Sequence, residues 1–260
     1  MDLPHVVTID NNDNNDNNNV VIPVVDDVNP LYNFFLHHTE KKVDKWLQYF
    51  DVYHQHFQRF RGKPVNILEI GVQNGGSLQM WREYFGDQCK IWGVDIDPAC
   101  KAHEAFWRNK YQDDNISVII GDQGDRGFLK GLVKSLPAMD IIIDDGGHQM
   151  HQQIASFEEL YPSINPGGVY LVEDTHTSYW PSFGSGLLDE RSFIEYSKHK
   201  LDELNGWHYS NGPTITNITN NTAQISFNDS IVTFTKKTYR QFSIGRPRRE
   251  VRLLGVSLPD

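Results

Sequence analysis

Two pairs of acidic residues, with a histidine close behind the first, are the residues best suited to chemistry in this sequence. Asp144 and Asp145 directly follow an apolar run at 141–143, and Glu173 and Asp174 directly follow a second run. Such runs indicate buried strands, where terminal carboxylates are costly unless a proton, a cation or hydrogen bonds neutralise them. If the two strands are neighbours, both pairs converge at one edge of a sheet. Because no lysine or arginine stands between the pairs in the sequence, they predict a divalent ion with oxygen ligands, Mg²⁺ or Mn²⁺ rather than Zn²⁺.

A histidine near each acidic pair is a candidate for proton transfer. His148 lies three residues after Asp145, beyond two glycines, which predicts that it acts beside the ion as a base instead of a ligand. His176, close behind the second pair, is the competing candidate. Tyr179 and Trp180 follow in the same loop, where their aromatic faces could stack on the C–H faces of a sugar acceptor. Each residue alone also has an ordinary explanation as a helix cap, a loop carboxylate or a core aromatic, so the prediction depends on the whole set.

Three earlier apolar runs also end in polar residues. The segment "LEIGVQNGGS" places Glu69 and several glycines at a turn into a helix, where the backbone can approach a bound group and helix amides are free. Asp95 ends the next run, where an acidic side chain commonly accepts hydrogen bonds from ribose hydroxyls. Asp122 and Gln123 end the third, where an adenine edge could be held. The glycines alone are weak evidence, but the three ends together predict an adenosine-type site. Glu69 at the turn favours the cationic nucleoside S-adenosylmethionine over a dinucleotide.

The elements that must position these residues follow from a regular alternation after Pro64. The five apolar segments "VNILEI", "KIWGVDI", "ISVII", "MDIII" and "GGVYLVE" are separated by helical patterns. This order predicts an α/β fold with a doubly wound, mostly parallel, Rossmann-like sheet and helices on both faces. The segments "AQISF" and "IVTFT" predict a C-terminal β-hairpin that closes the sheet. Before the alternation, "TEKKVDKWLQYFDVYHQHFQRF" predicts one amphipathic helix that carries Val43, Trp46, Leu47, Phe50 and Tyr53 on its apolar face.

Composition limits the classes of function. An Asn/Asp-rich stretch predicts a disordered or extended tail over residues 1–30, followed by a catalytic domain over 31–240 and an extended tail over 241–260. The formal charge of −10 argues against a nucleic-acid partner. No apolar run approaches the roughly 20 residues that span a bilayer, and no secretory signal is recognisable, so neither a membrane span nor export is expected. With only Cys89 and Cys100, no disulfide framework is indicated, which suggests a cytoplasmic, reducing location.

The segments "NILEIGVQNGGSLQMW", "GVDIDPACK", "IGDQGDRGFL", "DIIIDDGGHQMHQQ" and "VEDTHTSYW" together resemble one family. It comprises the metal-dependent class I S-adenosylmethionine O-methyltransferases that act on sugars, including macrolide-sugar and rhamnosyl methyltransferases. Some relatives carry the label cephalosporin hydroxylase, which these residues do not support. The "DDGGH" and "VEDTHTSYW" blocks are much more specific than the glycine turn. The Asn-rich N-terminal stretch departs from the family pattern.

The resemblance implies roles for individual residues. Asp145, Glu173 and Asp174 correspond to metal ligands, and His148 to the general base, with a small-molecule or glycan sugar as acceptor. It also makes a homo-oligomer an option, which nothing in the sequence decides. An NAD-type oxidoreductase and a non-catalytic nucleoside-binding module remain alternatives. The residues expected at the methyl-donor site are Glu69, Gly71, Gly75, Ser77, Asp95, Ile96, Asp122, Gln123 and Asp144.

Overall fold

A computed structural model describes residues 6–7, 22–23, 29–112, 114–209 and 215–238 of the chain. Two short strands near the N-terminus, β1 (Val6–Val7) and β2 (Ile22–Pro23), pair with each other antiparallel. The rest of the expected N-terminal tail up to residue 28, and the expected C-terminal tail from 241, lie outside the described residues.

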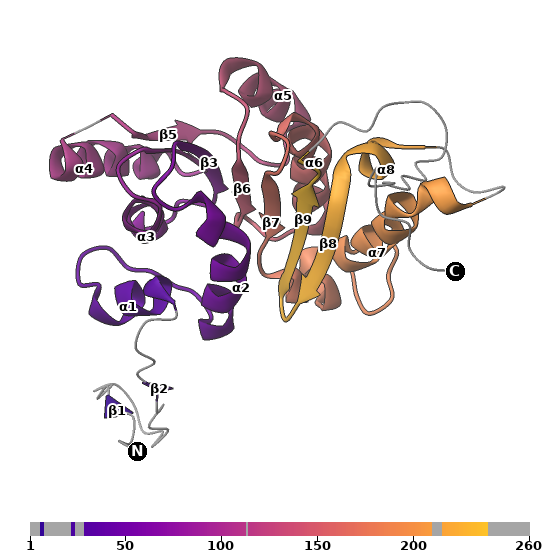
Figure 1. The fold of residues 1–260 in the computed structure, drawn as a ribbon, viewed down its shortest axis with the longest axis horizontal. Coiled ribbons are helices and arrows are strands. Elements are labelled where there is room, and N and C mark those ends of the chain that lie inside the picture. The colour runs from indigo at the N-terminus through magenta and orange to yellow at the C-terminus, as the bar shows by residue number, and fades with distance from the viewer. Residues whose placement is uncertain (1–5, 8–21, 24–28, 113, 210–214, 239–260) are drawn as a thin grey trace, which may run out of the picture.

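A seven-stranded mixed sheet forms the centre of the molecule, in the order β5-β4-β3-β6-β7-β9-β8 (Figure 1). The first five strands in chain order are parallel to one another, and the last two form an antiparallel hairpin against β7. The predicted parallel sheet with a C-terminal hairpin is therefore confirmed. The strands are β3 (Val65–Ile70), β4 (Cys89–Asp95), β5 (Ile116–Ile120), β6 (Ile141–Asp144), β7 (Val169–Val172), β8 (Thr222–Asn228) and β9 (Ile231–Lys236).

Helices cover both faces of this sheet because successive strand residues point to opposite sides. In β6, for example, Ile141 and Ile143 join one hydrophobic cluster while Ile142 joins the other. The first cluster packs under α1 (Pro30–His37), α2 (Leu47–Phe57), α3 (Gly76–Phe85) and α4 (Lys101–Tyr111). The second packs under α5 (Arg126–Ser135), α6 (Met150–Leu160), α7 (Phe193–Leu204) and α8 (Asn217–Asn221). Short 3-10 turns occupy Gln58–Phe60, Pro98–Cys100, Tyr161–Ser163, Thr175–Tyr179, Pro181–Phe183 and Gly206–His208.

The first predicted helix is shorter than its apolar pattern suggested. Helix α2 begins at Leu47, so Val43 and Trp46 are not part of it. The preceding segment runs in a non-helical path across the start of α3, where a Cβ added at Gly76 would lie 2.3 Å from the carbonyl oxygen of Lys42. Tertiary contacts of this segment override its helical periodicity, because the same residues cover the sheet edge at which the polar strand ends meet. A separate helix, α1, precedes it and was not predicted.

The carboxyl ends of the parallel strands gather the predicted polar residues at one edge. Strand β6 lies between β3 and β7, with Asp144 beside both Ile70 and Val172. In open α/β sheets, ligands bind at this edge. Among the described residues, no helix combines the length and the apolar character that crossing a bilayer requires.

Candidate active site

A cavity of about 400 Å³ opens at the carboxyl ends of the parallel strands. It extends from the glycine turn after β3 to the acidic residues after β7, and the segment before α2 forms its remaining wall through Asp44, Lys45 and Trp46. Nine of the residues predicted from the sequence line it: Gly71, Asp95, Ile96, Asp122, Gln123, Asp145, His148, Glu173 and Asp174.

Glu69 lies outside this lining, together with its helical neighbour Ser77. Its carboxylate is fully buried and accepts hydrogen bonds of 2.8 Å from Ser77 Oγ and of 2.8 Å from Trp81 Nε1. Burial raises the pKa of Glu69 to about 7, against the opposing effect of the nearby Lys45 ammonium. The side chain therefore ties β3 to α3. Gly75, also outside the lining, has a positive φ of 76° and packs against His103.

Asp95 organises the backbone at the donor end of the cavity. Its Oδ2 accepts from the amides of Val72 and Gln73, both at 2.9 Å, and its Oδ1 accepts from the amide of Asp97 at 2.9 Å. Burial opposes ionisation, but these three hydrogen bonds outweigh it and lower the pKa of Asp95. Because Oδ1 accepts only one of these bonds, it retains capacity for a ligand hydroxyl.

The amide of Gln123 is bonded within the protein. Nε2 donates to Asp144 Oδ1 at 2.8 Å, and Oε1 accepts from the amide of Gly147 at 2.8 Å. Asp144 is buried behind the cavity, and burial raises its pKa to about 7 in spite of this bond and a second one from Tyr170. Gln123 and Asp144 thus brace the loop that carries the first acidic pair, whereas Asp122 remains on the lining.

Three of the predicted groups converge at the other end of the cavity. Ligand atoms of Asp145, His148 and Asp174 all lie within 4.8 Å of one another. His148 and Asp174 both adopt left-handed backbone conformations, with φ of 54° and 53°. Such conformations are unfavourable for residues other than glycine and are concentrated at functional sites. The two turns aim both side chains at the same point.

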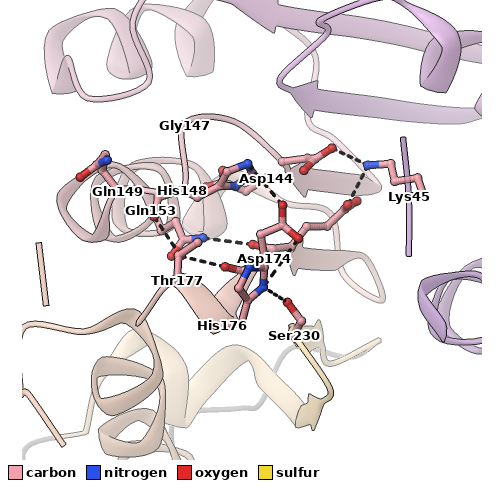
Figure 2. A network of polar contacts seen from close by, with 12 residues as sticks. Lys45, Asp144, Gly147, His148, Gln149, Gln153, Asp174, His176, Thr177 and Ser230 are labelled. Carbon is pink, nitrogen blue, oxygen red and sulfur yellow. Dashed lines mark hydrogen bonds and ion pairs between the residues drawn. The ribbon is translucent and has the colours of Figure 1, made fainter. Parts of the chain in front are cut away.

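Hydrogen bonds from neighbouring elements hold this cluster (Figure 2). Tyr49 of α2 donates its hydroxyl hydrogen to Asp174 Oδ1 at 2.5 Å. Thr177 Oγ1 lies 3.1 Å from the carbonyl oxygen of His148 and 2.8 Å from that of Asp174, so it joins the two turns. His176 points toward Ser230, with 2.6 Å between Nδ1 and Oγ, and is not part of the lining.

Lys45 is a residue of this site that the sequence did not reveal. Its ammonium contacts Asp145 Oδ2 and lies 2.6 Å from Glu173 Oε2, and its side chain is only 3% exposed. The two acidic pairs therefore do have a lysine between them in space, although none stands between them in the sequence. Burial raises the pKa of Asp145 and Glu173. It opposes the charge on Lys45 as well, but the two carboxylates outweigh that effect and raise the lysine pKa. The sequence signal for such a residue is indirect: two buried carboxylates need a cationic partner, but they do not indicate which lysine or arginine supplies it.

Exposed aromatic residues lie next to the cluster. Trp46, which is 43% exposed, stacks on His176 with a centroid distance of 4.6 Å, and Trp180, 48% exposed, meets His176 in a T-shaped arrangement at 4.6 Å. Tyr179 is exposed beside them. The predicted residues Tyr179 and Trp180 are outside the cavity lining, whereas Trp46, which was predicted on the apolar face of a helix and not as a site residue, belongs to it.

The donor set suits a divalent ion. Asp145, His148 and Asp174 each place one possible ligand atom within 4.8 Å of the others, close enough for groups around one small ion. Glu173 Oε1 and His148 Nδ1 are buried without a hydrogen-bond partner, so both retain an unused acceptor or donor position. The hard carboxylate oxygens favour Mg²⁺ or Mn²⁺.

Comparisons with known proteins agree with the fold. Residues 68–175 match the family model described as "Methyltransferase domain". The chain is 35% identical over 176 residues, 64% of its length, to 8-demethyl-8-alpha-L-rhamnosyl tetracenomycin-C 2'-O-methyltransferase of Streptomyces olivaceus. It is 40% identical over 139 residues, 51% of its length, to mycinamicin VI 2''-O-methyltransferase of Micromonospora griseorubida. The chain spans 44% and 32% of the lengths of these two relatives.

A solved structure extends this similarity. The MycE methyltransferase of the mycinamycin biosynthetic pathway, in complex with Mg, SAH and mycinamycin VI, superposes with a TM-score of 0.69 at 26% identity. The match covers 85% of this chain and 55% of that one. The sheet order and the structural match define the class of fold: the chain has a class I methyltransferase fold, and residues 68–175 match the methyltransferase-domain model. Within that class, its homologues are macrolide-sugar and rhamnosyl-sugar O-methyltransferases.

Proposed function

We propose that this protein is an S-adenosylmethionine-dependent O-methyltransferase that methylates a sugar hydroxyl of a glycosylated small molecule with the help of a divalent ion. The observation that carries the proposal is the convergence of Asp145, His148 and Asp174 at one end of the cavity whose other end carries Asp95 and the glycine turn. A donor and an acceptor bound in this cavity would have their reactive groups side by side. The homologues named above support the same reaction.

The donor end suits an adenosine-type ligand. Asp95 Oδ1 can accept from a ribose hydroxyl, Ile96 offers an exposed apolar side chain, and Asp122 offers a carboxylate. Gly71 allows the glycine turn after β3 to pack against the acidic loop after β6, because a Cβ there would lie 2.0 Å from the carbonyl oxygen of Asp145. Glu69, Gly75, Ser77 and Asp144 then support the donor site from behind the lining.

The acidic end suits activation of a hydroxyl. We assign Asp145, Glu173 and Asp174 as the residues that hold the ion, which supplies electrostatic stabilisation where negative charge develops on the acceptor oxygen. His148 removes the hydroxyl proton, and Asp174 Oδ2, 3.4 Å from His148 Nε2, stabilises the imidazolium that forms. The oxygen then forms a bond to the methyl carbon as the sulfonium–carbon bond breaks, with S-adenosylhomocysteine leaving.

The acceptor is proposed to lie over the exposed aromatic residues. Trp46, His176 and Trp180 form a continuous surface beside the cluster, and aromatic faces pack well on the C–H faces of sugars and on apolar aglycones. One homologue is named for a rhamnosyl tetracenomycin and another structure contains mycinamycin VI, both glycosylated compounds. This surface supports a glycoside acceptor over nucleic acid, as does the formal charge of −10.

Two measurements test the proposal. Calorimetric titration should show binding of S-adenosylmethionine, and a screen of rhamnosylated and amino-sugar glycosides, read by mass spectrometry, should show the mass of one added methyl group. EDTA should stop the transfer and Mg²⁺ should restore it. Donor binding with no methylated product from any glycoside would favour the non-catalytic nucleoside-binding module. Binding of a nicotinamide cofactor instead of S-adenosylmethionine would favour the oxidoreductase.

A further inference from the structure

Lys45 occupies an unusual position for a lysine. It precedes α2 in a segment without regular structure, yet its ammonium reaches the ends of β6 and β7, where it meets Asp145 and Glu173. Figure 2 shows Lys45 entering the network from a separate part of the chain, with both ion-pair contacts. Lys42, three residues earlier, has a side chain that is 66% exposed and pairs with Asp44. The burial of Lys45 is therefore specific to that position in the segment.

The charges at the site explain why a cation is needed there. Glu173 has a side chain that is 1% exposed, and Asp145 is 20% exposed, so both carboxylates have lost most of their hydration. Among the described residues, no lysine or arginine other than Lys45 forms an ion pair with Asp145 or Glu173. Its ammonium stabilises the pair of carboxylates in the same way as a metal ion bound to both would.

We propose that Lys45 is a positioning residue that holds Asp145 and Glu173 together before metal binds and competes with the divalent ion for these two carboxylates. The proposal rests on the metal-assisted function proposed above. An ammonium that contacts one oxygen of each carboxylate must withdraw when an ion binds the same two carboxylates, or else repel the ion at short range. In either case, the positive charge of Lys45 weakens metal binding and limits loading of the site to conditions of sufficient metal.

The variant Lys45→Met removes the charge while keeping a long, unbranched side chain. Its affinity for Mn²⁺, measured by electron paramagnetic resonance of the free ion, should increase about tenfold or more over the wild type. In EDTA, the melting temperature of Lys45→Met should be lower than that of the wild type, because two buried carboxylates have lost their cation. Adding Mg²⁺ should then raise the melting temperature of the variant more than that of the wild type. Lys42→Met is the matched control and should leave Mn²⁺ affinity and both melting temperatures unchanged.

Each outcome decides between alternatives. Equal or weaker Mn²⁺ binding by Lys45→Met, with binding intact in the wild type, would overturn the inference and leave the proposed function standing. Absence of Mn²⁺ binding in both proteins would overturn the metal-assisted function as well. Should Lys45→Met fold only with metal present, Lys45→Gln, which keeps hydrogen-bond donors without the charge, provides the same affinity comparison. If Lys45→Arg, which keeps the positive charge, binds Mn²⁺ with wild-type affinity, the higher affinity of Lys45→Met is due to loss of the charge.

Discussion

His148 Nε2 and Asp174 Oδ2 lie 3.4 Å apart at the ends of two different strands, and both residues adopt left-handed backbone conformations. The two turns are joined through Thr177, which contacts the carbonyl oxygens of both residues. Left-handed residues other than glycine cost on the order of 1–3 kcal/mol each, and they persist only where the surrounding structure imposes them. The fold accepts this cost to place an imidazole beside a carboxylate at the cavity.

Replacing His148 with Ala should lower kcat by about 10²–10⁴-fold, because the acceptor hydroxyl loses its base. The dissociation constant of S-adenosylmethionine should stay within about threefold of wild type, since the donor end of the cavity is unchanged. Steady-state kinetics and calorimetry measure the two effects. His151→Ala, at the exposed start of α6, is the control and should retain full activity. Wild-type kcat in His148→Ala would transfer the proton-accepting role to another group.

Glu69→Gln should change the pH dependence of stability. Burial raises the pKa of Glu69 to about 7 in the folded protein from an ordinary value of 4.5, so between these pH values the folded state holds a proton that the unfolded state has lost. The free energy of unfolding of the wild type therefore falls as pH rises from 4.5 to 7, by up to about 3 kcal/mol from this group. Gln has no such titration, so the stability of the variant relative to wild type should rise over that interval in urea unfolding curves.

The same variant tests the role expected for Glu69 from the sequence. Its carboxylate is bonded to Ser77 and Trp81 and lies outside the cavity lining, so donor affinity should change by less than about threefold. A loss of donor affinity of tenfold or more in Glu69→Gln, under conditions where the variant is fully folded, would restore the sequence-based assignment of Glu69 to the donor.

The sequence predicted the sheet and several of the polar residues that gather at its edge, because both are encoded locally. Each strand is an apolar run, and Asp95, Asp145 and Glu173 follow such runs directly, so the parallel arrangement is enough to bring them to one edge. The direction of the side chains could not be predicted in the same way. Glu69 also lies near a strand end, yet its side chain points into the core, where Ser77 and Trp81 of α3 donate hydrogen bonds to its carboxylate.

Lys45 shows the other limit of local reasoning. It is separated from Asp145 by 100 residues and belongs to a charged, lysine-rich segment that is typical of an exposed surface. The apolar periodicity of this segment, which includes Trp46 and Leu47, predicted a helix that begins before α2. The contacts of the segment with α3 and with the site hold it in a non-helical path instead. Long-range electrostatic pairing of this kind leaves no pattern in the sequence.

Gly71→Ala should destabilise the protein by about 2–4 kcal/mol and abolish donor binding. Gly71 has a φ of 95°, and a Cβ added there would lie 2.0 Å from the carbonyl oxygen of Asp145, a backbone atom that cannot move without displacing the acidic loop. Gly131→Ala is the matched control. Gly131 lies in α5 with no atom within 4 Å of the added Cβ, so this change should stabilise the protein by roughly 0.5–1 kcal/mol. Thermal unfolding and calorimetry with S-adenosylmethionine measure both variants.

Trp46→Ala should raise the KM for a glycoside acceptor about tenfold or more while leaving kcat within a few-fold of wild type, because the ring is proposed to contact the acceptor rather than the reacting atoms. Binding of S-adenosylmethionine and of Mn²⁺ should be unchanged, which separates loss of the aromatic surface from displacement of the adjacent Lys45. Phe227→Ala, an exposed aromatic residue on β8 outside the cavity lining, should behave as wild type in all three measurements. An unchanged KM in Trp46→Ala would remove Trp46 from the acceptor site, since a ring that is 43% exposed and stacked on His176 would then serve only to cover that histidine.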